Sequence, residues 1–310
     1  MSTAQRKKII VILGPTATGK TELSIKLAKK FGGEIISADS RAVYRGLDIG
    51  TAKPPLTYKN QGKTAKNKTA YFRGVPHYLI DFLAPKKTFS AFDFALKARK
   101  LIKKIKLPII VGGSGFWIDA ALKENLLGQA PPNPVLRKKL ERKSTADLFK
   151  RLKKLDPKRA ETIQKTNKRR LIRAIEIAVF KKSGSCNALP PANYSVLYLG
   201  LTLPNPALKQ RIRKRFLKWL KQGLIAETKK LTKQVSKKRL KEIGLVYPII
   251  AAYLDGKISR EEMITRSVNS IYHYAKRQKT WFRRNKDIHW IKNYSEALRL
   301  SKKFLKANGL

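Results

Sequence analysis

The sequence predicts an α/β fold: a phosphate-loop (P-loop) core with a mostly parallel sheet and an inserted small all-helical domain. Two strand-to-glycine junctions predict the sheet, because residues 7–21 and 107–115 each run from a short apolar, β-branched strand into a glycine-rich loop. Residues 122–193 lack strand patterns and predict the insert, which divides the core into residues 1–121 and 194–310.

The composition indicates a folded protein with a polyanionic partner. Of 310 residues, 70 are Lys or Arg and 20 are Asp or Glu, which gives a formal net charge of +50. The 42% of hydrophobic residues suffices for a packed core, and the single Cys excludes a disulfide framework or a multi-cysteine zinc site. No apolar run approaches the roughly 20 residues that span a bilayer, so we expect a cytoplasmic protein without a membrane anchor. Nucleic acid is the leading partner and an anionic membrane surface the second, with a lysine-rich proteome bias as the alternative.

The first junction contains the most informative motif. After the strand at residues 7–13, residues 14–21 read Gly-Pro-Thr-Ala-Thr-Gly-Lys-Thr and fit G-x-x-x-x-G-K-S/T; a helical apolar stripe follows as far as Phe31. In this context backbone N–H groups converge on an anion, Lys20 neutralises a phosphate, and the Thr21 hydroxyl can hold Mg²⁺. The motif predicts a di- or triphosphate site without specifying the ligand. The expected diphosphate-binding residues are Gly14, Pro15, Thr16, Ala17, Thr18, Gly19, Lys20 and Thr21.

Two polar residues follow later strands and have two interpretations each. Asp39 lies just past the predicted strand at residues 34–37, where ligands of open α/β sheets bind, but it also suits the cap of a turn. Ser114 lies in the glycines that follow the strand at residues 107–111. It can contact a phosphate or a base, or it can belong to a tight turn.

The insert and the later core are predicted to be mainly helical. The caps Asn133, Ser144, Asp156 and Asn167 predict four short helices with basic faces, the last closed by Gly184. Strand character returns at residues 195–203, and residues 55–71 are expected to form a lysine-rich loop.

Two helices near the end of the chain carry many cations. The first bears Arg211, Arg213 and Arg215 and ends near Gly223. The second starts at a predicted capping box, Ser259-x-x-Glu262, and runs to about Arg284. Its end mixes basic and aromatic residues, a pattern that grips phosphates and stacks bases. The alternative, with aromatics in the core and cations in solvent, stays open.

Residues 14–54 resemble the opening of tRNA dimethylallyltransferases, which transfer a five-carbon prenyl group to N6 of an adenosine beside the anticodon. The resemblance continues in order over nearly the whole chain. Its most specific parts are Ala-Asp-Ser-Arg at 38–41, Gly-Thr-Ala-Lys-Pro at 50–54 and Ala-Lys-Arg-Gln-x-Thr-Trp-Phe-Arg at 275–283, and further matching blocks lie at 76–81, 108–116 and 170–176.

The resemblance implies dimethylallyl diphosphate as prenyl donor and tRNA as acceptor, with Mg²⁺ as cofactor. The expected catalytic residues are Asp39 as general base for the adenine amine, and Thr16 and Arg215 at the leaving diphosphate. The resemblance and the basic helix together give the expected tRNA contacts: Asp39, Ser40, Arg41, Ala42, Ser114, Arg137, Arg169, Arg170, Leu171, Ile172, Arg173, Lys276, Arg277 and Arg283.

The chain departs from the family pattern at several places, two of which bear on the expected site, and leaves three rival functions. Ala42 stands where the family usually has Gln, and Gly244-Leu245-Val246-Tyr247 replaces a Gly-Tyr-Lys-Glu stretch. The rivals are a small-molecule kinase, a prenyltransferase of free adenine nucleotides, and a non-catalytic RNA-binding protein with a vestigial phosphate loop. The insert and the net charge favour tRNA, and a monomer is the simplest assembly.

Overall fold

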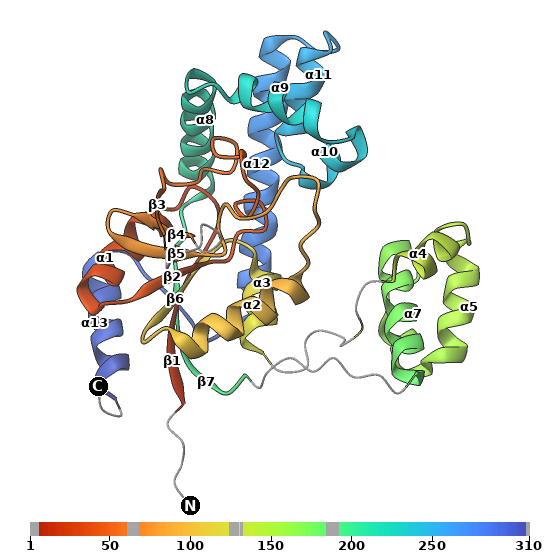
Figure 1. The fold of residues 1–310 in the computed structure, drawn as a ribbon, viewed down its shortest axis with the longest axis horizontal. Helices are drawn as coiled ribbons and strands as arrows, with labels where there is room; N and C mark the ends of the chain where they lie inside the picture. Colours follow the sequence, from red (N-terminus) through yellow and green to blue (C-terminus); the bar gives the residue numbers. More distant parts are fainter. Residues whose placement is uncertain (1–5, 61–67, 124–129, 131–132, 184–191, 308–310) are drawn as a thin grey trace, which may run out of the picture. The chain divides into compact units, whose positions relative to one another are not determined.

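The computed structural model describes residues 6–60, 68–123, 130, 133–183 and 192–307. The chain divides into two compact units, residues 1–123 with 192–310 and residues 124–191. The first unit is built on one eight-stranded sheet with the strand order β3-β4-β5-β2-β6-β1-β7-β8 (Figure 1). The predicted α/β class is therefore confirmed.

The sheet is parallel from β5 to β8, while β3, β4 and β5 are joined by antiparallel pairs. Two of these strands correct an expectation: part of the predicted lysine-rich loop forms the hairpin β3–β4, and residues 61–67 lie outside the described residues. The strands are β1 Lys7–Leu13, β2 Glu34–Ser37, β3 Thr57–Asn60, β4 Lys68–Phe72, β5 Val75–Tyr78, β6 Pro108–Gly112, β7 Tyr194–Gly200 and β8 Ile288–Trp290.

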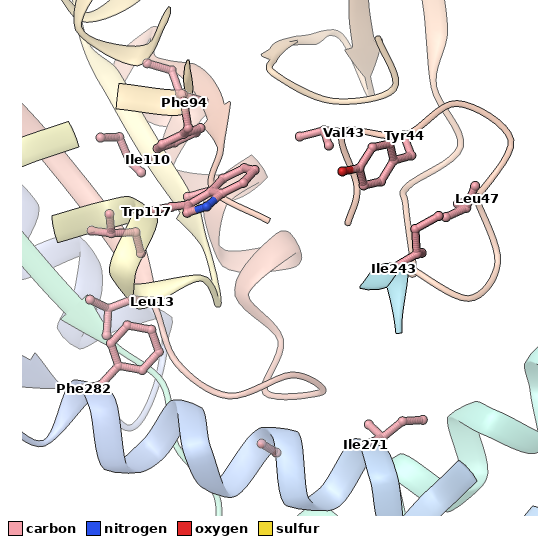
Figure 2. Close-up of a cluster of buried hydrophobic side chains, with 14 of the residues drawn as sticks. Leu13, Val43, Tyr44, Leu47, Phe94, Ile110, Trp117, Ile243, Ile271 and Phe282 are labelled. Atoms are coloured by element: carbon pink, nitrogen blue, oxygen red, sulfur yellow. The ribbon is translucent and has the colours of Figure 1, made fainter. Parts of the chain in front are cut away.

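Alternation along β1 separates two hydrophobic layers, as the period of a strand requires. Ile9 and Val11 belong to one buried cluster, which also contains Phe94, Trp117 and residues of several later helices (Figure 2). Ile10 and Ile12 belong to a second cluster on the other face. Because both faces of the sheet are covered at this strand, the sequence of β1 after its first two residues is continuously apolar and does not alternate with polar residues.

Helices supply both layers of this unit. Helices α1 and α13 pack in the second cluster, whereas α2, α3 and α8 to α12 pack in the first. Their bounds are α1 Lys20–Phe31, α2 Ala91–Lys104, α3 Gly115–Leu122, α8 Asn205–Lys221, α9 Leu224–Gln234, α10 Lys237–Ile243, α11 Tyr247–Leu254, α12 Arg260–Phe282 and α13 Tyr294–Lys306.

The start of α12 is predicted correctly only in part. The Ser259 hydroxyl accepts a hydrogen bond from the Glu262 N–H, as expected for an N-cap. The Glu262 carboxylate pairs with Arg266. The second hydrogen bond of a capping box, from the Ser259 N–H to the Glu262 carboxylate, is therefore not among the contacts of the described residues. Among the described residues no helix is both long and apolar enough to cross a membrane.

The second unit contains four short helices over its own apolar core. They are α4 Pro134–Glu141, α5 Thr145–Leu155, α6 Pro157–Thr162 and α7 Lys168–Lys182. Each begins at a predicted cap, and the side chains of Asn133, Ser144, Asp156 and Asn167 all accept a backbone N–H three residues on. The predicted closing residue, Gly184, lies outside the described residues.

Candidate active site

A cavity of about 400 Å³ lies at the carboxyl edge of the sheet. Strands β1, β2 and β6 are neighbours there, so the loops that follow them converge. The lining includes the phosphate loop (residues 14–21), the turn after β2, the segment 51–54, the glycines after β6 and two arginines of α8. These residues are Thr16, Ala17, Gly19, Lys20, Thr21, Ser24, Ile35, Ser37, Asp39, Ala42, Thr51, Ala52, Lys53, Pro54, His77, Ile80, Val111, Gly112, Gly113, Arg211 and Arg215.

The phosphate loop needs its glycines for two physical reasons. Gly14 has a φ of 140°, and a Cβ there would lie 2.2 Å from the carbonyl oxygen of Leu201. Gly19 has a φ of 96° and caps α1 without any side-chain hydrogen bond to the helix. The first N–H groups of α1 therefore have no side-chain cap, which is the usual arrangement of an anion site.

Two cations meet at this loop without an acidic hydrogen-bond partner. Lys20 Nζ donates to the carbonyl of Pro15 at 2.6 Å, and Arg215 Nη2 donates to Thr16 Oγ1 at 2.7 Å. Burial lowers the pKa of Lys20 to about 8; the charge of Asp39 opposes this effect and the charge of Arg215 adds to it. Burial also lowers the pKa of Arg215 to about 10, and its buried Nε has no hydrogen-bond partner among the described residues. This geometry suits a bound polyanion.

The structure shows Asp39 as the cap of a turn and also places its carboxylate in the lining of the cavity. Its Oδ1 accepts the N–H groups of Arg41 at 2.9 Å and Ala42 at 3.3 Å, which is the expected turn. The carboxylate also lines the cavity and acts electrostatically on Lys20 and Arg215. In the described part of the chain Oδ2 accepts no hydrogen bond. The turn therefore orients the carboxylate and leaves one oxygen for a ligand.

Ser114 forms hydrogen bonds to the turn that contains Asp39 and Ser40. Its Oγ accepts the Ser40 N–H at 3.0 Å and donates to Ser40 Oγ at 3.3 Å. Arg41 Nε donates to the carbonyl of Ile243 at 2.8 Å, and its guanidinium lies 4.8 Å from the ring centroid of Tyr274. Burial, followed by the charge of Asp39, raises the pKa of the Tyr274 hydroxyl.

Several contacts of this site are not anticipated from the sequence. Buried Gln278 of α12 accepts the Thr16 N–H with Oε1 and donates Nε2 to the Gly113 carbonyl, both at 2.9 Å. A polar residue on the apolar face of α12, at the spacing of Ile271 and Ala275, is the signal that marks it.

A second unanticipated set of contacts holds the segment that lines the cavity at residues 51–54. The Glu227 carboxylate accepts the backbone N–H groups of Asp48, Ile49 and Gly50 at 2.7 to 3.0 Å and the Tyr247 hydroxyl at 2.9 Å. The largely buried amine of Lys53 pairs with Asp48 at 2.7 Å and with Asp81. Asp48, Lys53 and Asp81 belong to matching blocks of the resemblance and Glu227 and Tyr247 do not, and composition and spacing assign none of them a role.

The expected tRNA contacts on α12 are available at the surface. Lys276, Arg277 and Arg283 are exposed. Lys276 Nζ lies 5.0 Å from the ring centroid of Tyr272, and Arg277 lies 5.9 Å from that of Tyr274. The rings of Tyr272 and Tyr274 are only partly buried. The basic and aromatic residues of the sequence pattern therefore lie together at the surface of this helix.

The expected tRNA contacts in the helical unit fall into three groups in the structure. Arg169 and Arg170 are exposed on α7. Arg137 and Arg173 instead bind the buried Glu176 carboxylate, Arg137 through Nε at 2.7 Å and Arg173 through Nη1 at 3.2 Å. Leu171 and Ile172 are 0% and 6% exposed and pack in the core of the unit, so contact of these two side chains with RNA is not supported.

The site fits a metal only together with an anionic ligand. The described residues contain no group of three or more His, Cys, Asp or Glu that could hold an ion. Thr21 is exposed at the cavity, and its hydroxyl makes no hydrogen bond in the described part of the chain. Mg²⁺ is commonly held by one or two protein oxygens with substrate phosphates and water, so the Thr21 hydroxyl suits such an ion.

The comparisons with known proteins agree with this geometry. The family model described as IPP transferase matches residues 42–285, and the model described as isopentenyl transferase matches residues 7–64. The chain is 38% identical to the tRNA dimethylallyltransferase of Pelotomaculum thermopropionicum, over 94% of this chain and 93% of the relative. It is 40% identical to that of Anoxybacillus flavithermus, over 92% and 90%. The solved tRNA isopentenylpyrophosphate transferase of Bacillus halodurans has a TM-score of 0.65 and 35% identity, covering 96% of this chain and 95% of the other. On these matches the chain belongs to the IPP transferase family.

Proposed function

We propose that this chain transfers a dimethylallyl group from dimethylallyl diphosphate to N6 of adenosine 37 in tRNA and releases diphosphate. The observation that carries the proposal is the cavity that Lys20, Arg215 and Asp39 line together, with the Asp39 carboxylate acting electrostatically on both cations. A cationic end suits the leaving group, and a carboxylate suits the amine that attacks. The family membership supports tRNA as the acceptor and is consistent with a dimethylallyl donor.

We assign the diphosphate to the phosphate loop, residues 14–21. Negative charge develops on the leaving diphosphate as its bond to the allylic carbon breaks, and Lys20, Arg215 and the N–H groups at the start of α1 can stabilise it. The Thr16 hydroxyl, held by Arg215, is placed to contact the same group. When Mg²⁺ is bound it supplies further charge neutralisation, and we propose that the Thr21 hydroxyl holds it.

We assign proton removal to Asp39. The new bond joins N6 of adenine to the allylic carbon, and the electron pair of the broken carbon–oxygen bond leaves with the diphosphate. One hydrogen of N6 then passes to Oδ2 of Asp39, because Oδ1 is already engaged with the N–H groups of Arg41 and Ala42.

We propose that RNA docks on the exposed cations and at the turn after β2. The surface candidates are Lys276, Arg277 and Arg283 on α12 and Arg169 and Arg170 on α7. The adenine must leave its stack to enter the cavity, which costs a few kcal/mol and is easiest in a single-stranded loop. We assign Ser40, Arg41, Ala42 and Ser114, which lie in or contact the turn that contains Asp39, to the RNA side of the site, while Arg137 and Arg173 act by holding α7 through Glu176.

The test is a transfer assay with Mg²⁺, dimethylallyl diphosphate and unmodified tRNA, read by mass spectrometry of the digested RNA. We expect a five-carbon increment on one adenosine. Modification of free adenine nucleotide but not of tRNA would favour the mononucleotide prenyltransferase, and ATP-dependent phosphorylation of a small molecule without any increment would favour the kinase. RNA binding without chemistry would favour a non-catalytic protein. We propose a monomer as the simplest assembly, which sedimentation analysis checks.

A further inference from the structure

One face of α12 contacts three separate loops of the carboxyl edge. Tyr274, Gln278 and Trp281 are spaced four and three residues apart, so they lie on the same side of the helix. Tyr274 stacks under Arg41 of the turn that follows Asp39. Gln278 binds the phosphate loop and the Gly113 carbonyl, and Trp281 Nε1 donates to Asp119 of α3 at 2.9 Å.

The Gln278 contacts are closely fitted. A Cβ on Gly113 would lie 2.1 Å from Gln278 Nε2, and the side chain is 6% exposed. Both hydrogen bonds have normal lengths. The amide accepts one of them at Oε1 and donates the other from Nε2. No hydrophobic residue can make either bond, so packing alone does not explain a glutamine here.

The hydrogen bond to Thr16 has a consequence for the loop. Because the Thr16 N–H donates to Gln278, it is directed towards α12 and is not free for a phosphate oxygen. Thr16 is thus held by two hydrogen bonds, one from its backbone N–H to Gln278 and one to its hydroxyl from Arg215. Together these two contacts fix where the Thr16 side chain lies in the cavity.

We infer that Gln278 is a positioning residue for the reaction: it holds Thr16 and the Gly113 loop in the arrangement that receives the diphosphate. The inference rests on the proposed function for the identity of the donor. Gln278 does not touch the reacting atoms. It connects the phosphate loop to the helix whose exposed cations Lys276 and Arg277 lie immediately before it.

The first experiment compares Gln278→Met with the matched control Thr280→Val in the transfer assay. Methionine keeps the length of the side chain but loses both hydrogen bonds. Thr280 lies on the same helix, is exposed and bonds only to the Lys276 carbonyl. We expect the KM for dimethylallyl diphosphate to rise about tenfold in Gln278→Met, from the loss of two hydrogen bonds. The tRNA dissociation constant should stay within twofold of the wild-type value, and the control should resemble wild type.

The second experiment is a double-mutant cycle with Gly113→Ala, whose Cβ displaces the Gln278 amide. If both residues act through the same contact, Gly113→Ala alone reproduces the defect, and the double variant loses no more than either single variant. Additive losses would overturn the inference. So would a Gln278→Met enzyme with wild-type kinetics, or one in which both substrates weaken equally and Tm falls.

Binding of inorganic diphosphate with Mg²⁺, measured by calorimetry, separates this inference from the proposed function. If wild type makes no prenylated tRNA, the proposed function fails. A tenfold weaker diphosphate affinity of Gln278→Met still supports the positioning role, and an unchanged affinity overturns it.

Discussion

The sheet-centred unit and the helical unit use basic residues in opposite ways. At the cavity, Lys20 and Arg215 have only neutral hydrogen-bond partners, the Pro15 carbonyl and the Thr16 hydroxyl. In the helical unit, Arg137 and Arg173 hold the Glu176 carboxylate. Burial of Glu176 favours the neutral acid, but hydrogen bonds from Arg137, the Asn133 N–H and Arg173 outweigh it and lower its pKa. Lys20 and Arg215 therefore line a cavity, whereas Arg137 and Arg173 hold the helical unit together through a shared buried acid.

The largest expected effect tests the chemistry of the sheet-centred unit. Asp39→Asn keeps the shape and the acceptor oxygen of the turn but cannot take a proton. We expect transfer to fall by roughly 10²–10⁴-fold, which is the usual contribution of a general base. Single-turnover kinetics with saturating tRNA measure the loss. Retention of full activity would mean that the base is another group, and unchanged tRNA affinity is the control for folding.

The next effect tests the structural role of arginines in the helical unit. Glu176→Ala removes the acid that Arg137 and Arg173 share and should destabilise this unit by about 1–3 kcal/mol, because both arginines are partly exposed and water screens the charges that remain. Hydrogen exchange should rise across residues 133–183 and stay constant in β1. Glu141→Ala, an exposed acid on α4, is the matched control. Equal exchange in both variants would contradict the assignment.

The third prediction uses the pKa of Lys20, which burial lowers to about 8. Diphosphate binding requires the cationic form, so affinity for inorganic diphosphate should fall by up to about tenfold per pH unit above pH 8. The effect of Lys20 on folding has the opposite pH dependence. In the absence of ligand, the unfolded chain binds the Lys20 proton more tightly than the folded chain does, so this group increases the free energy of unfolding as the pH rises from about 8 to 10.5. Calorimetry of diphosphate binding at several pH values checks the first part. Lys20→Arg should give a flat profile, and a wild-type profile that is equally flat would contradict it.

The smallest expected effect concerns exposed cations. Charge reversal of Arg277 and Arg283 should weaken tRNA binding severalfold and reduce its salt dependence, because each lost phosphate contact removes about 0.7–0.9 from the slope of the logarithmic plot. Filter binding between low and physiological salt measures this. Reversal of Lys302 and Lys303 on α13 changes the net charge equally, so an identical effect there would show that only bulk charge matters.

Local signals in the sequence account for the fold better than for the site. The caps Asn133, Ser144, Asp156 and Asn167 each act within three residues, so their helices are predictable. The hairpin β3–β4 is missed because its lysine-rich strands lack an alternating apolar pattern.

Residue roles that depend on distant partners are harder to predict. Spacing alone does not choose among the arginines of α8, and the structure places Arg211 and Arg215 at the cavity. Leu171 and Ile172 follow exposed arginines in a matching block, but the turn of α7 directs both into the core. Gln278 stands out in the sequence as a polar residue on the apolar face of α12, but its partners, the Thr16 N–H and the Gly113 carbonyl, are identified only in the structure.

The hydrogen bond between Thr16 and Gln278 joins residues 262 positions apart, which has a consequence for synthesis of the chain. The ribosome therefore makes the phosphate loop well before it makes α12. Contacts of such long range also form late in folding, because the chain between them must first be ordered. A partly made chain therefore carries a phosphate motif but no complete cavity. Its affinity for diphosphate should appear only after α12 has been translated and docked.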